Sequence, residues 1–187
     1  MLLDLIVGTR PNFIKVAALI NEITKYNFYT NKKIKFRLIH TGQHYSRKLS
    51  NNFFDDLQIP KPDFNINAGS GSQAKQKAHI MIGYEKILFK KKPDICIVVG
   101  DVNSTVSCAI VAKKMNVGLA HIEAGIRSND RTMPEEINRI LTDSITDYFF
   151  TTSMQANKNL IQEGVEAKKI YFVGNTMIDT LKNNLNK

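Results

Sequence analysis

Three acidic side chains stand at positions where an open α/β sheet does its chemistry. Asp101 follows an apolar run at residues 95–99, Glu123 follows another at 117–122, and Glu135 opens a helix. Because ligands of such sheets bind outside the carboxyl ends of the strands, we expect all three acids at one edge. Carboxylates that meet in a cleft perturb one another's pKa, as proton transfer requires. The sequence therefore predicts an acid–base site in an enzyme.

Each acid was also weighed against a structural role. Asp101 could cap the helix that follows it, because Asp is favoured at that position. Thr132 and Glu135 have the spacing of a capping box, in which both side chains satisfy backbone N–H groups. Glu123 precedes a flexible Ala-Gly-Ile-Arg loop and has no capping role, which favours chemistry. The convergence of the three acids carries the prediction more than any one of them.

Basic side chains are placed to meet an anion near these acids. Residues 8–15, GTRPNFIK, follow the first apolar run and open a helix. Free backbone N–H groups and the helix dipole favour a phosphate there, and Arg10 and Lys15 would add two cations. A plain helix start with a surface Arg and Lys is an equal interpretation. The segment has neither GxGxxG nor GxxxxGK[ST], so it is neither a dinucleotide fingerprint nor a P-loop.

Three further residues are candidate substrate contacts at the same edge. His44 closes the second strand and could donate to a phosphate or sugar, or be a loop histidine with a satisfied hydrogen bond. Arg127 lies in the loop between the second and third acids. Arg139 could instead form helix-face ion pairs with Glu136 or Asp143, which lie three and four residues away.

The elements that must position these residues alternate along the chain. Near-continuous apolar strands separated by helices imply a parallel sheet covered on both faces. Right-handed crossovers would wind it into a doubly wound, Rossmann-like α/β sheet. The predicted strands comprise residues 2–7, 35–40, 95–99, 117–122, 148–151 and 170–173. The stripes predicted to form core at helical spacing are Val16, Leu19, Ile20 and Ile23; Val102, Val106, Ala109 and Ile110; and Ile137, Ile140, Leu141 and Ile145.

Proline and glycine mark the predicted element ends. Pro11 and Pro134 stand where helices would begin, and Gly164 stands where a helix would end. Residues 65–76 are the least regular segment and resemble a loop that enters a helix.

Composition is that of a globular protein with one sizeable core: 187 residues, 43% hydrophobic and 23% charged. The first apolar run contains Asp4 and has no basic leader, so a signal peptide is not expected. No apolar run approaches the roughly 20 residues that span a bilayer, so no membrane partner is expected. Cys96 and Cys108 have neither CxxC nor zinc-type spacing, and we expect reduced core thiols in a cytoplasmic protein.

The formal charge of +9 suits nucleic acid, an anionic membrane or an anionic small molecule. The lysines lie mostly in solvated turns, without the interleaved aromatic residues that stack on bases. A Lys-rich solvated surface is therefore favoured over a nucleic-acid partner.

Six segments together resemble the non-hydrolysing UDP-N-acetylglucosamine 2-epimerases, in that family's order and over nearly the whole chain. The resemblance implies a two-domain GT-B architecture, of which residues 1–175 would be the amino-terminal Rossmann-like domain. Residues 176–187 would begin a linker to a carboxyl-terminal domain absent from this chain. The family usually dimerises through this domain, so a homodimer is expected. The segments are Gly8 to Pro11 with Lys15, Thr41 to His44, Gly100-Asp101, His121 to Arg127, Pro134 to Arg139, and Gly174 to Thr176.

The resemblance also implies a reaction, the interconversion of UDP-GlcNAc and UDP-ManNAc for surface polysaccharide synthesis. Loss of the C2 proton, anti elimination of UDP to a 2-acetamidoglucal and re-addition would invert C2 without a redox or metal cofactor. Asp101, Glu123 and Glu135 would be this half's catalytic acids, and Arg10 and Lys15 would face the diphosphate and sugar. Which carboxylate takes the C2 proton stays open. The absent domain would supply most uridine contacts and a catalytic histidine.

The sequence departs from the family pattern in three places. Asn12 stands where many members have Glu, and the gap before Pro134 is shorter than in the best-known bacterial enzymes. Residues 69–73, GSGSQ, are closer to the branch that acts on UDP-2,3-diacetamido sugars. Three alternatives therefore stand beside the UDP-GlcNAc epimerase: an epimerase of a diacetamido sugar, a hydrolysing epimerase that releases free ManNAc, and a truncated, non-catalytic half-protein that binds sugar nucleotides.

Overall fold

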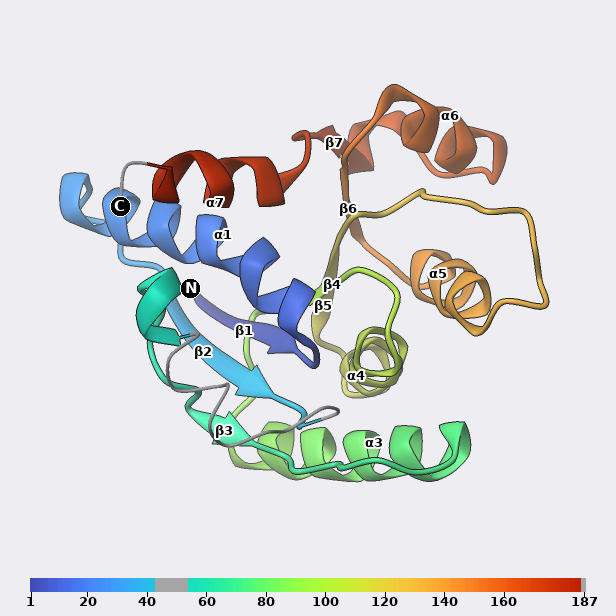
Figure 1. The fold of residues 1–187 in the computed structure, drawn as a ribbon, viewed down its shortest axis with the longest axis horizontal. Helices are drawn as coiled ribbons and strands as arrows, with labels where there is room; N and C mark the ends of the chain where they lie inside the picture. Colours follow the sequence, from blue (N-terminus) through green and yellow to red (C-terminus); the bar gives the residue numbers. More distant parts are fainter. Residues whose placement is uncertain (43–53, 186–187) are drawn as a thin grey trace.

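The computed structural model describes residues 1–42 and 54–185. In this part of the chain, seven strands form one sheet in the order β3-β2-β1-β4-β5-β6-β7 (Figure 1). Every neighbouring pair is parallel, which confirms the predicted sheet type. The strands are β1 (Leu2–Val7), β2 (Lys35–His40), β3 (Phe64–Asn65), β4 (Ile95–Val99), β5 (Gly118–Ile122), β6 (Tyr148–Thr151) and β7 (Ile170–Phe172).

Helices cover both faces of the sheet, as a doubly wound fold requires. Figure 1 shows α1 on one side of the central strands and α3 and α4 on the other. Two helices begin at the prolines expected from the sequence, with Pro11 and Pro134 in their first turns. The helices are α1 (Arg10–Tyr29), α3 (Gln73–Lys90), α4 (Asn103–Lys114), α5 (Pro134–Ser144), α6 (Met154–Gln162) and α7 (Thr176–Asn184), with a 3₁₀ turn at Ala167–Lys169.

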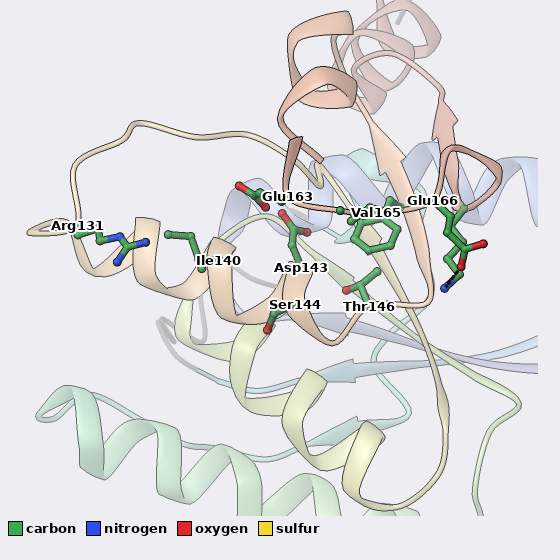
Figure 2. Close-up of a pocket in the computed structure, with 11 residues that line it drawn as sticks. Arg131, Ile140, Asp143, Ser144, Thr146, Glu163, Val165 and Glu166 are labelled. Carbon is green, nitrogen blue, oxygen red and sulfur yellow. Dashed lines mark ion pairs between the residues drawn. The ribbon is translucent and has the colours of Figure 1, made fainter. Parts of the chain in front are cut away.

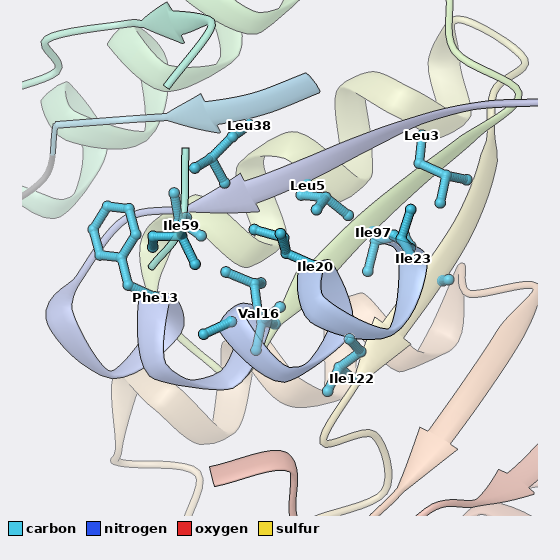
Figure 3. Close-up of a cluster of buried hydrophobic side chains, with 14 of the residues drawn as sticks. Leu3, Leu5, Phe13, Val16, Ile20, Ile23, Leu38, Ile59, Ile97 and Ile122 are labelled. Atoms are coloured by element: carbon cyan, nitrogen blue, oxygen red, sulfur yellow. The ribbon is translucent and has the colours of Figure 1, made fainter. Parts of the chain in front are cut away.

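Two apolar clusters hold the central strands between these helices. Alternate residues of β1 point to opposite faces, so Leu5 packs with Val16 and Ile20 of α1, as Figure 3 shows. Ile6 packs on the other side with residues of α3 and α4, including Tyr84. This side also buries the free thiols of Cys96 and Cys108, which confirms the prediction that both are core residues.

The sequence missed β3 and misjudged the orientation of α5. Strand β3 has only two residues at the sheet edge, too few to produce an alternating pattern. The predicted core stripe on α5 is wrong at Ile137 and Leu141, which are 38% and 46% exposed, although Ile145 packs against the core. The buried side chains of α5 are instead Glu136, Asn138, Thr142 and Asp143. The side chains of Glu136, Asn138 and Asp143 are buried with hydrogen-bond partners from the sheet edge and the loop before α5, as described below.

The final described helix packs back on the first. The Thr180 hydroxyl of α7 donates to the Ile14 carbonyl of α1 at 2.7 Å, and Asn175 caps α7 by accepting from the Met177 amide. The assignment of residues 176–187 to a linker stays a prediction. Among the described residues, no helix is long and apolar enough to cross a bilayer.

Candidate active site

The exits of β1, β4 and β5 are neighbours at the carboxyl edge because these strands are adjacent in the sheet. The turn at Gly100 shows how closely they meet. A Cβ placed on Gly100 would lie 3.4 Å from both the Glu123 Oε2 and the Lys15 Nζ, and 3.6 Å from the Asn12 Nδ2. Side chains from α1 and from the loop after β5 therefore converge on the turn that carries Asp101.

Glu123 has an unusual backbone for a residue with a side chain. Its φ is 71°, in the left-handed region that glycine favours. The amides of Glu123 and Ala124 both donate to the Phe150 carbonyl, which fixes this conformation. The Glu123 carboxylate forms an ion pair with Lys15, and both side chains are largely buried. Strained backbone of this kind is concentrated at functional sites, and here it directs the carboxylate toward Gly100.

Asp101 is held by donors from α5 and is not a helix cap. The capping position of α4 is occupied by Val102, which provides no side-chain hydrogen bond. The interpretation of Asp101 as the cap of this helix is therefore wrong. The Asp101 carboxylate pairs with the Arg139 Nη2 at 2.5 Å, and the Asp101 carbonyl accepts from the Asn138 Nδ2 at 2.8 Å. The Asp101 side chain is 29% exposed, so it remains open to a ligand.

Arg139 joins Asp101 to a buried acid. Its Nη1 donates to Glu136 at 3.0 Å, which confirms one of the two predicted helix-face pairs. The other predicted pair, to Asp143, does not form because Arg139 turns to Asp101. Burial alone would raise the pKa of Glu136, but the amides of Ser128 and Asn129 and the Arg139 guanidinium hold it below its ordinary value.

Glu135 lies apart from the other two acids. It is exposed in the first turn of α5, and within the described residues its side chain has no hydrogen bond or ion pair. The predicted capping box is wrong, because Met133 precedes the helix and the Thr132 hydroxyl donates to Asp130. The structure thus places Asp101 and Glu123 at neighbouring strand exits, each paired with a cation, and Glu135 in the exposed first turn of α5, one helical turn before Arg139.

The loop after β1 is closed by Asn12, a residue that the sequence did not single out as an organiser. The Asn12 Oδ1 accepts from the amides of Gly8 and Thr9, both at 3.1 Å, and its Nδ2 donates to the Val99 carbonyl of β4. The expectation that these N–H groups are free for an anion is therefore wrong. Arg10 is exposed at this edge, and Lys15 faces Glu123.

The remaining predicted contacts lie elsewhere or outside the described part of the chain. Arg127 has a side chain only 5% exposed, between Asp143 at 2.8 Å and Glu163 at 2.6 Å. Burial would lower the Arg127 pKa, but these two acids raise it overall. His44 lies outside the described residues. In the described residues, no group of three or more His, Cys, Asp or Glu side chains is arranged to hold a metal ion.

A cavity of about 530 Å³ lies beside this network, between α5 and residues 163–169. Figure 2 shows Asp143 and Glu163 directed toward it. Its lining contains none of Asp101, Glu123 and Glu135, so it is separate from the cluster of acids. Together, the sheet order and the paired acids define a Rossmann-like α/β domain with two ion-paired carboxylates at its carboxyl edge.

Comparison with known proteins shows which family has this domain. The family model described as UDP-N-acetylglucosamine 2-epimerase matches residues 27–187. The UDP-N-acetylglucosamine 2-epimerase of Methanocaldococcus jannaschii is 45% identical over 185 residues, covering 99% of this chain and 49% of the relative. A crystal structure of that enzyme with UDP-GlcNAc and UDP superposes with a TM-score of 0.93, covering 100% of this chain and 50% of that one. This chain belongs to the UDP-N-acetylglucosamine 2-epimerase family.

Two further known proteins are similar to this chain, one in sequence and one in fold alone. A UDP-2,3-diacetamido-2,3-dideoxy-D-glucuronate 2-epimerase of Pseudomonas aeruginosa is 40% identical, over 94% of this chain and 49% of the relative. A lipopolysaccharide outer core galactosyltransferase shares the fold alone, at 14% identity and a TM-score of 0.59, over 94% of this chain and 46% of that one. The fold is thus of the GT-B type, and the chain spans about half the length of the curated relatives it matches.

Proposed function

We propose that this chain is the acid-bearing half of an epimerase that inverts C2 of UDP-GlcNAc to give UDP-ManNAc. One observation carries the proposal: Asp101 and Glu123 meet at adjacent strand exits, each paired with a cation, in a chain of this family. The relative whose crystal structure contains UDP-GlcNAc superposes on the whole chain, which supports the choice of substrate.

The reaction needs a group that takes a proton and a group that assists a leaving oxygen. One of Asp101 and Glu123 would remove the C2 proton while the C1–O bond to UDP breaks, leaving a 2-acetamidoglucal. UDP would then add back to C1, and C2 would regain a proton on the opposite face. Lys15 and Arg139 balance the charge of the two acids in the free protein. Glu135, at the open rim, would act as the third acid once a sugar nucleotide is bound.

Substrate contacts at this edge are proposed for the cations already predicted. Arg10 is exposed at the start of α1 and would meet the diphosphate. Arg139 would contact the substrate while retaining Asp101, and His44 would complete the edge. Arg127 would have to release Asp143 or Glu163 to reach a ligand, so its contact is the most demanding of the set.

This chain spans about half the length of the relatives that it matches. Because the relatives are about twice as long, we propose that a further domain, on this chain or a partner, completes the site. We also propose a cytoplasmic homodimer with no nucleic-acid or membrane partner. Light scattering of the purified chain tests the dimer, and a monomer at micromolar concentration would contradict it.

A product assay tests the function and its main alternative. The chain, supplied with the remaining half of a close relative, is incubated separately with UDP-GlcNAc and with UDP-2,3-diacetamido-2,3-dideoxy-D-glucuronate, and the products are separated by ion-exchange chromatography. UDP-ManNAc from the first substrate is expected. Turnover of the second alone would favour the specificity of the Pseudomonas relative, and free ManNAc would identify a hydrolysing enzyme. No product from either would leave a non-catalytic sugar-nucleotide-binding half-protein.

A further inference from the structure

We propose that His121 and Asp143 are positioning residues that hold both acid-bearing turns in place, and that His121 does so with a proton on each ring nitrogen. This inference rests on the proposed function for its catalytic consequence. Its structural part stands on hydrogen-bond geometry, and both residues are almost completely buried.

The two residues connect three elements at the carboxyl edge. The His121 Nδ1 lies 2.7 Å from the Asp143 Oδ1, and its Nε2 lies 2.8 Å from the Gly100 carbonyl. The second oxygen of Asp143 accepts from the Gly125 amide at 3.0 Å. The Asp143 carboxylate of α5 therefore contacts both turns. It binds the turn after Glu123 directly, and it reaches the turn before Asp101 through His121.

The geometry defines the protonation of the ring. A carbonyl oxygen can only accept, so the Nε2 must carry a proton to bind Gly100. The Nδ1 faces a carboxylate and needs a proton as well, unless Asp143 itself is protonated. Burial alone would raise the Asp143 pKa, but His121, Arg127 and the Gly125 amide hold it below its ordinary value. The second oxygen of Asp143 also accepts from the Gly125 amide and pairs with Arg127, an environment that favours the ionised carboxylate, so both ring nitrogens of His121 face acceptors.

Charges around the pair alternate and balance. His121 comes from β5 and is 0% exposed, and Asp143 from α5 is 4% exposed. Arg127, from the loop after β5, donates to Asp143 and to Glu163 at the end of α6. Along His121, Asp143, Arg127 and Glu163, cations and anions alternate. This alternation offsets the cost of burying charge more fully than an isolated ion pair would.

The third donor to these turns comes from the same helix as Asp143. Asn138, which binds the Asp101 carbonyl, is 2% exposed, so α5 binds the Asp101 carbonyl directly and reaches the preceding Gly100 carbonyl only through His121 of β5. Loss of either His121 hydrogen bond would release the Gly100 turn from Asp143, and oriented catalysis is sensitive to displacements of this kind.

NMR of the 187-residue chain tests the structural part without reference to activity. At neutral pH, two N–H signals are expected for the His121 ring, assigned through a His121→Gln variant in which both disappear. Asp143→Asn should remove the Nδ1 proton signal and shift the Gly100 and Gly125 amide resonances. Glu163→Gln is the matched control, because it removes a carboxylate from the outer end of the same network, and it should retain both signals. A single ring N–H in the unmodified chain would overturn the proposal.

Kinetics of C2 exchange test the positioning role. In the assembled protein, Asp143→Asn is expected to lower kcat by about tenfold to a hundredfold with KM little changed, while Glu163→Gln stays within about twofold. Equal kcat in both variants would overturn the positioning role. If the unmodified protein showed no exchange with any sugar nucleotide, the proposed function would fail, and the NMR result would still decide the arrangement of His121.

Discussion

Glu123 and Gly125 show how single residues shape the proposed site. Both have positive φ, and they occupy the short turn between β5 and the loop that leads to α5. Glu123 accepts this strain because two amides anchor its turn to Phe150, so the carboxylate projects toward the β4 exit. Gly125 passes close to α6, where a side chain has no space. The direction of the acid therefore depends on a glycine two residues later.

Gly125→Ala is expected to destabilise the chain by about 2–4 kcal/mol, because the new methyl group combines left-handed backbone with a clash. Its Cβ would lie 2.5 Å from the Ala156 carbonyl oxygen and 2.9 Å from the Leu160 Cγ. Gly164→Ala is the matched control, since Gly164 also has positive φ but nothing within 4 Å of its Cβ position. It should cost only about 1 kcal/mol in urea unfolding. Equal losses in the two variants would refute the clash.

His40 makes stability depend on pH. Burial lowers its pKa to about 4 from an ordinary 6.5, so the unfolded chain binds the extra proton between these values. Neutral His40 therefore does not reduce the free energy of unfolding above about pH 6.5. This free energy falls as the pH drops toward 4. Between pH 7 and 5, the unmodified chain should lose about 2 kcal/mol more than His40→Gln in urea titrations. Parallel pH curves for the two proteins would rule out this linkage.

At the scale of elements, α5 departs most from an ordinary amphipathic helix. Its hydrogen-bonded polar residues face the sheet edge, and an apolar row including Ile137 and Leu141 faces outward. Glu136 binds the loop at residues 128–129, Asn138 and Arg139 bind Asp101, and Asp143 binds His121. The helix thus acts as a clamp on the two acid-bearing turns.

The adjacent acids Glu135 and Glu136 should separate chemistry from stability. Glu136→Gln is expected to lower stability by about 1–3 kcal/mol, because a buried carboxylate that accepts two amides and pairs with Arg139 loses its charge. Glu135→Gln, at an exposed position, should change stability by less than about 0.5 kcal/mol yet reduce C2 exchange. Urea unfolding and NMR exchange assays measure the two effects. The reverse pattern would show that the roles of the two acids were exchanged.

Sequence patterns predicted most elements because the strands are continuous apolar runs, and the strand exits located Asp101 and Glu123. They predicted the helix α5 but not which of its faces is buried, because residues such as Asn138 and Asp143 are buried through partners distant in the chain. Asn12 was missed for the same reason, since its amide bridges to Val99, 87 residues away. Hydrophobic periodicity contains no information about such polar contacts.

For the whole molecule, we propose that the acids of this chain form one side of a site. The relatives are about twice its length, and Asp101 and Glu135 remain accessible at the carboxyl edge. We expect the isolated chain to bind sugar nucleotides weakly and to show no epimerisation, with activity restored when the remaining half is supplied. Calorimetric titration with UDP-GlcNAc and the product assay measure these two properties. Full turnover by the isolated chain would show that it needs no further domain.

The most direct test of the proposed chemistry is proton NMR of UDP-GlcNAc in D2O with the chain and its supplied second half. We predict that solvent deuterium enters C2 while UDP-ManNAc appears, and that Asp101→Asn and Glu123→Gln, each shown to be folded, lose both changes. C2 exchange at the unmodified rate in the folded Glu123→Gln protein would contradict the assignment of this carboxylate to the reaction.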